Sequence, residues 1–402
     1  MTSPVNAPAN IHWPDAWPAE LRLLVVHLRM ALGTATAADQ ELSRQPVDWD
    51  TWLRWVERHR VGSFLFRRLP PSAQARLPEA VARKLRDIGV HNAQRALART
   101  GELLRLAAQL ERDGLRVIAF KGPVLSQDLY GDAGVRSAGD LDLLVSPADT
   151  LKASAVLQSA GYQRTYPDFE LTALQWRKYL RLQHELNHHH PQRGITVELQ
   201  WRLEGLALEF EDLWRARGSL GLAGQSLATL PWEANALFLF AHGARHGWSS
   251  LFWLLDVALV LQADKSSSAR GLWSTAQRMQ VTKPLMQGVA LANQLLGVAL
   301  PEGLAGQLER EGGNGGLVAE ALRRISRPDT QQRSTGDVFR DTLYSFRLQE
   351  TWRGKLSLVQ PRLLSPQNWK LWRLPDRWFW LYYPASPALW VWRRLRGGNS
   401  SK

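Results

Sequence analysis

The chain has 402 residues, of which 45% are hydrophobic, and its 50 lysines and arginines exceed its 37 acids by 13. This apolar content excludes a chain that is disordered throughout, and the absence of cysteine excludes disulfides and cysteine-based metal or redox sites. The positive charge favours anionic partners such as nucleoside triphosphates, nucleic acid or acidic lipid surfaces.

Helical and strand-like periodicities divide the chain into successive regions. Apolar spacing near 3.6 residues predicts helices over 18–33, 48–69 and 80–113, and the Asp113-Gly114 turn ends the last one. Short apolar or alternating runs predict strands over 115–120, 140–145 and 194–203, with helices over 123–130 and 147–160 between them. From about residue 230 the pattern is helical again, interrupted by loops at 311–316 and 327–336.

These elements predict an α+β fold in which a small mixed sheet is embedded between helical segments. The predicted regions are an N-terminal helical region at 1–113, a core with the sheet at 114–215, a helical domain at 216–340, and a basic, tryptophan-rich tail at 341–402.

Two aspartates begin the predicted strand 140–145. Because side chains alternate faces along a strand, Asp140 and Asp142 point the same way, while the intervening and following apolar residues point into the core. Carboxylates spaced in this way can share Mg²⁺ or Mn²⁺, although a lone Asp-x-Asp is also typical of a solvated strand edge. Glu198 lies on the polar face of the strand 194–203. It completes a three-carboxylate site if the two strands are neighbours, or pairs with an arginine on an exposed face.

The segment between the first two predicted strands contains candidate phosphate-binding residues. Lys121-Gly122 joins a strand to a helix, and such a turn presents backbone N–H groups and a lysine to a phosphate. Arg136 precedes Asp140 by four residues and is a further candidate. The alternatives are an ordinary strand–helix turn and a surface arginine.

Two groups of histidines were weighed as metal ligands. His242 and His246 share a helix face, which is a spacing that zinc can use, but no His-Glu-x-x-His motif accompanies them, so packing or acceptor binding is favoured. His188, His189 and His190 precede Pro191 in a predicted hairpin and are interpreted as part of its loop.

Residues 369–396 combine six tryptophans with six basic residues and the single acid Asp376. Such a segment suits packing of its aromatic side chains on the helical domain, a membrane interface or nucleic-acid stacking. Packing is favoured over a membrane surface, and nucleic acid is disfavoured because no nucleic-acid-binding motif is present. Pro384 and Pro387 argue against one long helix. No apolar run approaches the length of a membrane span and no signal peptide is seen. The predicted location is therefore the cytoplasm, with the inner membrane surface as a peripheral alternative.

Several motifs in combination resemble the bacterial uncharacterised nucleotidyltransferase family of the polymerase-beta-like superfamily. The resemblance extends over roughly 90–260. Its motifs are Lys121-Gly122-x-x-Leu125, Leu129-Tyr130-Gly131-Asp132, Arg136-x-x-x-Asp140-Leu141-Asp142-Leu143-Leu144-Val145, Val197-Glu198-Leu199-Gln200-Trp201, and His242-Gly243-Ala244-Arg245-His246-Gly247-Trp248 followed by Leu251 and Asp256. Gln200 stands where the family has histidine, and Lys121-Gly122 replaces the superfamily's Gly-Ser turn.

The resemblance implies a two-metal transfer of a nucleoside monophosphate from ATP or another NTP to an unknown acceptor, which could be a small molecule, a sugar or a protein. It implies that Asp140 and Asp142 hold both Mg²⁺ or Mn²⁺ ions, that Glu198 holds the one that activates the acceptor, and that Lys121, Gly122 and Arg136 lie near the triphosphate. The alternative is a non-catalytic nucleotide-binding or toxin–antitoxin-type module. The complete set of three carboxylates favours the enzyme.

Overall fold

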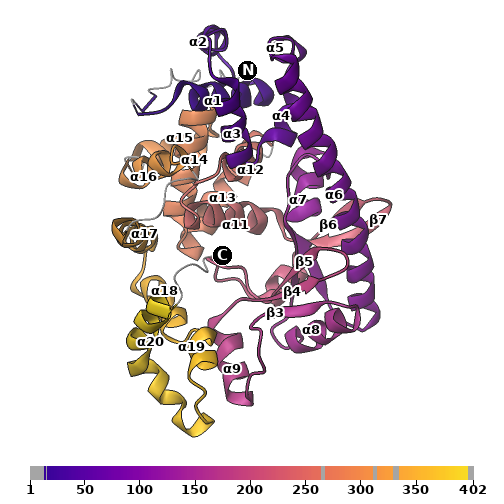
Figure 1. Ribbon diagram of the computed structural model, residues 1–402, viewed down its shortest axis with the longest axis vertical. Coiled ribbons are helices and arrows are strands. Elements are labelled where there is room, and N and C mark those ends of the chain that lie inside the picture. Colours follow the sequence, from indigo (N-terminus) through magenta and orange to yellow (C-terminus); the bar gives the residue numbers. More distant parts are fainter. Residues whose placement is uncertain (1–12, 15, 264–267, 311–314, 329–334, 397–402) are drawn as a thin grey trace.

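The computed structural model describes residues 13–14, 16–263, 268–310, 315–328 and 335–396. Helices occupy both ends of the molecule, and the sheet lies to one side between them (Figure 1). The N-terminal helices are α1 (Ala19–Leu32), α2 (Ala37–Leu42), α3 (Trp49–Arg58), α4 (Gly62–Arg68), α5 (Pro71–Gln74) and α6 (Glu79–Arg112). Helix α6 runs along one side of the molecule and reaches from the N-terminal helices to the sheet (Figure 1).

A seven-stranded mixed sheet has the order β3-β4-β5-β2-β1-β7-β6. Its strands are β1 (Val117–Phe120), β2 (Asp140–Val145), β3 (Gln163–Tyr166), β4 (Glu185–His190), β5 (Ile195–Gln200), β6 (Gly218–Leu222) and β7 (Gln225–Thr229). The helices between the strands are α7 (Gly122–Tyr130), α8 (Thr150–Ser159), α9 (Ala173–Leu182) and α10 (Phe210–Arg215). Strand β2 is antiparallel to β1 and parallel to β5, so it lies inside the sheet rather than at an edge.

The two faces of β2 have different chemical characters. Leu141, Leu143 and Val145 are buried with side chains of α6 and α8, which cover one face of the sheet. On the other face, Leu144 packs with the helices that follow the sheet in sequence. Asp140 and Asp142 lie on this same face, at the start of the strand. Alternation along a single strand therefore anchors it on one side and presents two carboxylates on the other.

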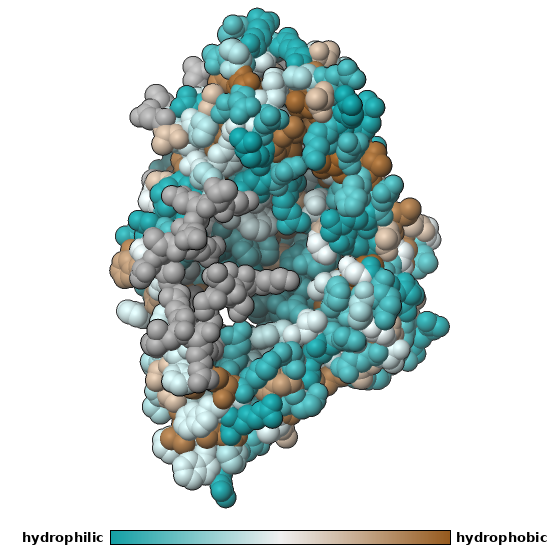
Figure 2. All heavy atoms as spheres, viewed as in Figure 1, coloured by the Kyte–Doolittle hydropathy of each residue, from teal (hydrophilic) through white to brown (hydrophobic). Residues whose placement is uncertain are grey.

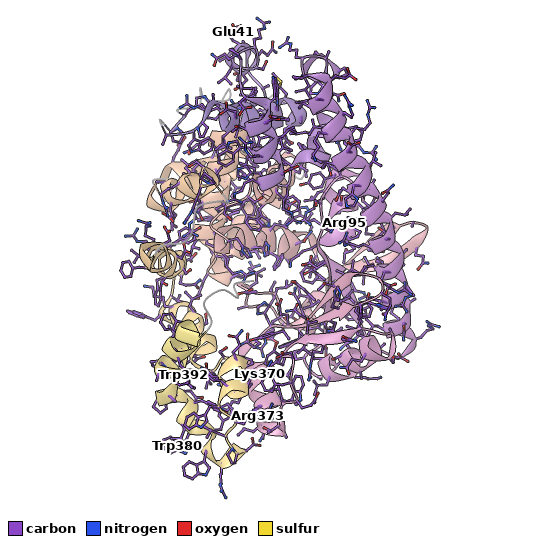
Figure 3. The ribbon with its side chains drawn as sticks, viewed as in Figure 1. Glu41, Arg95, Lys370, Arg373, Trp380 and Trp392 are labelled. Carbon is purple, nitrogen blue, oxygen red and sulfur yellow. The ribbon has the colours of Figure 1, made fainter. Side chains whose placement is uncertain are left out.

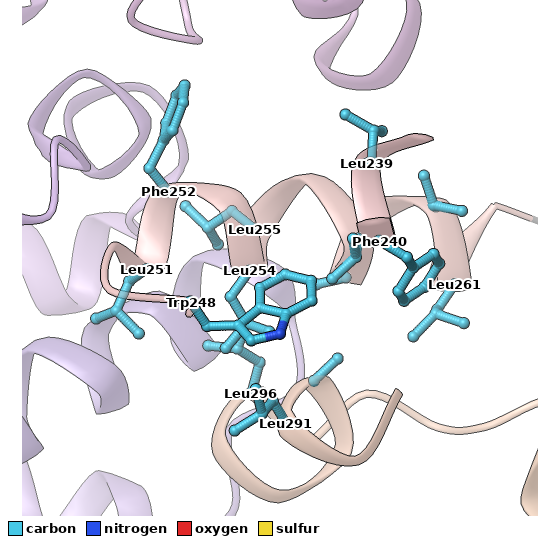
Figure 4. Close-up of a cluster of buried hydrophobic side chains, with 14 of the residues drawn as sticks. Leu239, Phe240, Trp248, Leu251, Phe252, Leu254, Leu255, Leu261, Leu291 and Leu296 are labelled. Atoms are coloured by element: carbon cyan, nitrogen blue, oxygen red, sulfur yellow. The ribbon is translucent and has the colours of Figure 1, made fainter. Parts of the chain in front are cut away.

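Helices that follow the sheet form the helical part of the molecule. These are α11 (Trp232–Arg245), α12 (Leu251–Gln262), α13 (Ser268–Met279), α14 (Thr282–Leu296), α15 (Glu302–Arg310), α16 (Gly315–Ile325) and α17 (Thr335–Leu348). Trp248 lies in the corner between α11 and α12, fully buried among leucines of α12 and α14 (Figure 4). A Cβ atom at Gly243 would lie 2.3 Å from the Trp248 ring, so a glycine is required there. This packing fixes the corner from which several cleft residues project.

The tail continues as α18 (Trp352–Leu363), α19 (Pro366–Leu371), a 3₁₀ segment η2 (Asp376–Leu381) and α20 (Tyr382–Arg396), at the end of the molecule next to α9 (Figure 1). The tail is not one long helix, as predicted, but the break lies at Pro375 before η2, whereas Pro384 and Pro387 both lie within α20. Across the residues that the structure describes, no helix combines the length and apolar character needed to cross a membrane.

The structure confirms the predicted α+β class and the sheet embedded between helices. The helix predicted over 48–69 is broken between α3 and α4, where Arg60 has φ of 57° and the buried His59 accepts a hydrogen bond from the N–H of Leu251. The sheet continues past the predicted boundary at residue 215, because β7 pairs with β1. Parts of the predicted loops, 311–314 and 329–334, lie outside the described residues.

The histidines predicted to lie in a hairpin loop belong instead to strand β4, because its antiparallel pairing with β5 extends to His190 and Ile195. His188 is fully buried, and its Nε2 lies 2.9 Å from Oγ of Ser154. His190 packs edge-on against Tyr162. These contacts give the histidines packing roles within the sheet.

Candidate functional site

Parallel pairing of β2 and β5 brings two of the predicted carboxylates side by side. Asp142 lies opposite Glu198 in the register, and Asp140 lies opposite Thr196. The expectation that Glu198 lies on the strand next to 140–145 is confirmed. Asp140 is half-buried at the beginning of β2, whereas only 1% of Asp142 is exposed. Asp142 is therefore the most buried of the three acids, and Glu198 is half-buried like Asp140.

Lys121 and Gln200 hold these carboxylates in place. The Lys121 Nζ atom lies 2.7 Å from Oδ1 of Asp142 and 3.7 Å from Oε2 of Glu198. The Gln200 amide donates to the same two oxygens, at 2.9 and 3.2 Å. The single ammonium charge balances one of the two acids, so burying both as anions would leave one negative charge uncompensated.

Burial and mutual repulsion shift the protonation equilibria of these groups. Burial raises the pKa of Asp142, against the effect of Lys121, and burial together with Asp142 raises the pKa of Glu198. Burial by itself lowers the pKa of Lys121, but the Asp142 and Glu198 carboxylates outweigh it and the net pKa is raised. The pKa of Glu198 is raised to about 10, so this side chain carries a proton at neutral pH in the absence of another cation.

One oxygen of the site lacks a hydrogen-bond partner. The Oδ2 atom of Asp142 is buried and makes no hydrogen bond, whereas Oδ1 accepts from both Lys121 and Gln200. In the described parts of the chain, no three His, Asp or Glu side chains are already arranged as a set of metal ligands. Lys121 contacts Asp142 and Glu198, and Asp140 lines the same cleft and acts on the same ammonium, because all three acids raise the pKa of Lys121.

The turn after β1 holds Lys121 in a rare backbone conformation. Lys121 has φ of 52° and ψ of −154°, a region that residues with a side chain seldom adopt and that costs about 1–3 kcal/mol. Gly122 begins α7, also with positive φ, and a Cβ atom there would lie 3.3 Å from the backbone oxygen of Asp140. The Lys-Gly pair thus brings the start of α7 against the start of β2 and aims the lysine at the carboxylates.

Arg136 makes its main contacts with an acid far away in the sequence. Its Nε and Nη2 atoms donate to the carboxylate of Asp256 in α12 at 2.9 Å, and Tyr130 donates to the same carboxylate at 2.7 Å. The guanidinium also lies over the ring of Phe252, 4.3 Å from its centroid. Arg136 lines the cleft described next, but its buried pair with Asp256 gives it a positioning role that the sequence did not reveal.

A cleft of about 410 Å³ lies between the polar face of the sheet and the α11–α12 corner. It is lined from the sheet side by Lys121, Asp140, His184, Glu185, Glu198, Gln200 and Glu204, and from the helical side by Arg60, Arg136, Phe238, His242, Arg245, His246, Phe252 and Trp253. Figure 2 shows this face of the molecule hollowed between the two parts, with hydrophilic side chains in the hollow. Its lining thus contains basic and acidic side chains from both parts of the molecule.

The two helical histidines are neighbours in this cleft. The His242 and His246 rings lie 4.6 Å apart, and His246 stacks on Trp253 at 4.7 Å. Burial lowers the pKa of His242, and burial lowers the pKa of His246 to about 4. Both rings are therefore neutral at physiological pH, and their surroundings agree with packing or acceptor binding.

A charged cluster forms another wall of the cleft. The Nε2 atom of His184 lies 3.0 Å from Glu204 and 3.3 Å from Glu185, and Arg245 pairs with Glu204. Burial lowers the pKa of His184, but hydrogen bonds to these two acids outweigh it and raise the pKa to about 9. Burial raises the pKa of Glu204, yet His184 and Arg245 lower it to about 2.

We expect this cluster to be visible in pH titrations. A raised pKa means that protonated His184 contributes its full stabilisation below its unfolded pKa near 6.5, and that this contribution is lost as pH rises through about 9. Replacing Glu204 with Gln should lower the pKa of His184 by about one unit or more, measured by NMR titration of the imidazole. Glu209→Gln, at an exposed position, is the control. A wild-type His184 that titrates near 6.5 would contradict the ion-pair geometry.

The structure places Gln200 on the polar face of β5 with Glu198, as strand alternation predicts, and it also adds cleft residues that the sequence did not indicate. His184, Glu204 and Arg60 have no local signal, because each lies in a loop or at the end of an element and reaches the cleft only through the tertiary fold.

The family model described as "Uncharacterised nucleotidyltransferase" matches residues 45–297. No match is found among curated proteins. The matched region contains every residue that lines the cleft, and it begins before and ends after the roughly 90–260 over which the motifs are recognisable. Since this region is more than half of the sequence, the chain belongs to the uncharacterised nucleotidyltransferase family.

Proposed function

We propose that the protein transfers a nucleoside monophosphate from an NTP to an acceptor, with divalent cations bound by Asp140, Asp142 and Glu198. The observation that supports this most strongly is the pairing of Asp142 and Glu198 on adjacent parallel strands, beside a cleft. In this reaction the acceptor forms a bond to the α-phosphorus, the bond to the bridging oxygen breaks, and pyrophosphate leaves.

The residues present fit Mg²⁺ or Mn²⁺. All three candidate ligands are carboxylates, which these hard cations prefer, and the buried Oδ2 of Asp142 has no competing hydrogen bond. When bound, the ions would neutralise phosphate charge and polarise the α-phosphate. Gln200 would keep Asp142 and Glu198 oriented, because its amide already bridges them.

Lys121 has two roles in this proposal. In the absence of ligand its ammonium pairs with Asp142 at 2.7 Å and lies 3.7 Å from Glu198. Once these acids have another cation, the lysine is released to contact the triphosphate. Gly122, at the start of α7, lets the phosphates approach the N–H groups of the helix end. Arg136 lines the same cleft and is the second proposed phosphate contact.

The acceptor would enter from the side of α11 and α12. His242, His246 and Trp253 offer neutral aromatic surfaces there, and the ion-paired cluster around His184 offers polar groups. A mixed surface of this kind suits a polar acceptor that carries a hydroxyl group. The competing proposal, a nucleotide-binding module without activity, is favoured by the ammonium of Lys121 between the acids.

The two proposals are separated by incubating the purified protein with each labelled NTP, Mg²⁺ and cell extract. Labelled product that depends on the protein and on Mg²⁺ supports transfer. Nucleotide binding without release of pyrophosphate for any NTP or extract supports the non-catalytic module.

We expect Lys121→Ala to change metal and nucleotide binding in opposite directions. Without the ammonium, the carboxylates are free, so Mn²⁺ should bind about tenfold more tightly in the absence of nucleotide, which corresponds to about 1.4 kcal/mol. NTP affinity in the presence of Mn²⁺ should fall by a similar factor, because a phosphate contact is lost. Electron paramagnetic resonance of Mn²⁺ and calorimetry measure the two affinities.

Lys84→Ala is the matched control for this variant, because Lys84 is half-exposed on α6 and far from the cleft in sequence and fold. If Mn²⁺ affinity does not change in Lys121→Ala, the lysine does not compete for the carboxylates. If Lys121→Ala changes Mn²⁺ affinity but leaves NTP affinity unchanged, the proposed contact between Lys121 and the triphosphate is refuted. Arg136→Ala in the same calorimetric series tests the second phosphate contact.

A further inference from the structure

The tryptophan-rich tail has one face directed into the protein. Trp369, Phe379 and Tyr382 are at most 5% exposed and belong to the same apolar core as the sheet and α9. Asp376 accepts a hydrogen bond from Thr172 at 2.6 Å, next to the start of α9. The tail therefore packs on the protein itself, but on the sheet and α9 rather than on the helical domain as predicted, and this packing holds it in a fixed orientation.

The opposite face of the same elements exposes large aromatic side chains. Trp372, Trp378 and Trp380 are 40%, 48% and 62% exposed, and Tyr383 is 46% exposed. Within η2, Phe379 points inward while the tryptophans on either side of it point outward. Because the inner side chains already attach the tail, the outer ones are not explained by folding.

Basic side chains accompany these aromatic groups. Arg373 and Arg377 are exposed, and each is adjacent in sequence to an outer tryptophan, Trp372 and Trp378. Residues 351–402 hold ten lysines and arginines against the single acid Asp376, so they carry nine of the chain's 13 excess positive charges. The charge that suggested an anionic partner is thus concentrated in the tail and not in the cleft.

Figure 3 shows this face at one end of the molecule, where Trp380 projects from the tip and Trp392 lies on the outer side of α20. The sheet and the α11–α12 corner lie toward the middle, away from this end (Figure 1). A flat partner could therefore contact the end of the molecule without covering the cleft.

We propose that the face formed by Trp372, Arg373, Arg377, Trp378 and Trp380 docks the protein on the surface of an anionic lipid bilayer. Tryptophan is suited to the boundary between headgroups and acyl chains, because its ring is apolar and its N–H is polar. Arginine next to it is attracted by anionic headgroups. This arrangement needs no helix that crosses the membrane, because the five side chains of the face would lie at the bilayer surface.

The test is co-sedimentation of the full-length protein with vesicles of phosphatidylcholine alone or of an equal mixture with phosphatidylglycerol. We expect binding only to the anionic vesicles, and weaker binding when NaCl rises from about 0.1 M to about 1 M, which shortens the Debye length from about 10 to about 3 Å. Arg373→Glu with Arg377→Glu should lower the partition coefficient by roughly 25-fold or more, since each basic group near such a surface contributes about fivefold. The double variant Trp378→Ala, Trp380→Ala should lose the binding to anionic vesicles that remains at the higher NaCl concentration.

Lys84→Glu with Arg86→Glu is the matched control, because it makes the same change in net charge on the exposed face of α6. It should keep most of the binding. All four altered tail side chains are exposed, so the variants should melt like the wild type. The proposal is overturned if anionic vesicles do not sediment the protein, or if both tail variants bind as well as the control. Light scattering tests whether the face instead joins two copies of the chain. A wild-type dimer that becomes a monomer in the Trp378→Ala, Trp380→Ala variant would also overturn the proposal.

Discussion

Replacing Asp142 with asparagine is expected to reduce nucleotide transfer by about a thousandfold or more. The substitution keeps the size of the side chain but removes the negative charge from the most buried carboxylate of the site. Loss of a metal ligand that stabilises the transition state by about 4 kcal/mol corresponds to a rate change of this order. The measurement is turnover of labelled NTP by the purified variant, together with Mn²⁺ affinity by electron paramagnetic resonance.

Asp87→Asn is the matched control, because Asp87 is exposed on α6 and outside the cleft. The Asp142 variant should remain folded, since Leu141 and Leu143 still anchor β2 from the other face of the sheet. Unchanged turnover in a folded Asp142→Asn protein would refute the catalytic proposal. Lost turnover with unchanged Mn²⁺ affinity would show that Asp142 acts other than as a metal ligand.

Replacing Asp256 with alanine is expected to destabilise the protein by about 3–5 kcal/mol. The Arg136 side chain is 7% exposed, so its guanidinium would stay buried without a carboxylate, and Tyr130 would lose its acceptor. Such a change is a large part of the stability of an ordinary domain. Urea denaturation of the wild type and the variant, with equal m-values, measures it.

The double variant Arg136→Met, Asp256→Leu distinguishes a buried ion pair from a packing defect. It removes both charges and keeps apolar volume, so it should be more stable than Asp256→Ala. A double variant as unstable as the single one would show that volume rather than charge is responsible. The nucleotide affinity of the double variant is compared with that of Asp256→Asn, which keeps Arg136. If only the double variant binds nucleotide more weakly, Arg136 contacts the phosphates directly.

Sequence periodicity alone was sufficient to place the central strands and the carboxylates on them. The runs around 115–120, 140–145 and 194–203 correspond to β1, β2 and β5, and alternation put Asp140 and Asp142 on one face. These features are local, since each depends on residues only two positions apart. The break at Lys121-Gly122 was likewise visible, because glycine and proline mark such turns directly.

Strands without a clear apolar pattern were not predicted. β6 and β7 are largely exposed and contain glycine, serine and glutamine, so they have no strong alternation. They join the sheet because β1 offers β7 an unpaired edge. Similarly, the two faces of the tail could not be separated from its sequence, because the inward direction of Trp369 and Phe379 depends on where α9 lies.

The sequence by itself therefore determined the strand that bears the acids and the character of its two faces. Only the tertiary structure decided the partners of the charged groups. Lys121 reaches Asp142 across 21 residues and Arg136 reaches Asp256 across 120. Periodicity carries no information about such distant pairs, because they form only when separately folded elements pack together and a buried charge must find the nearest opposite one.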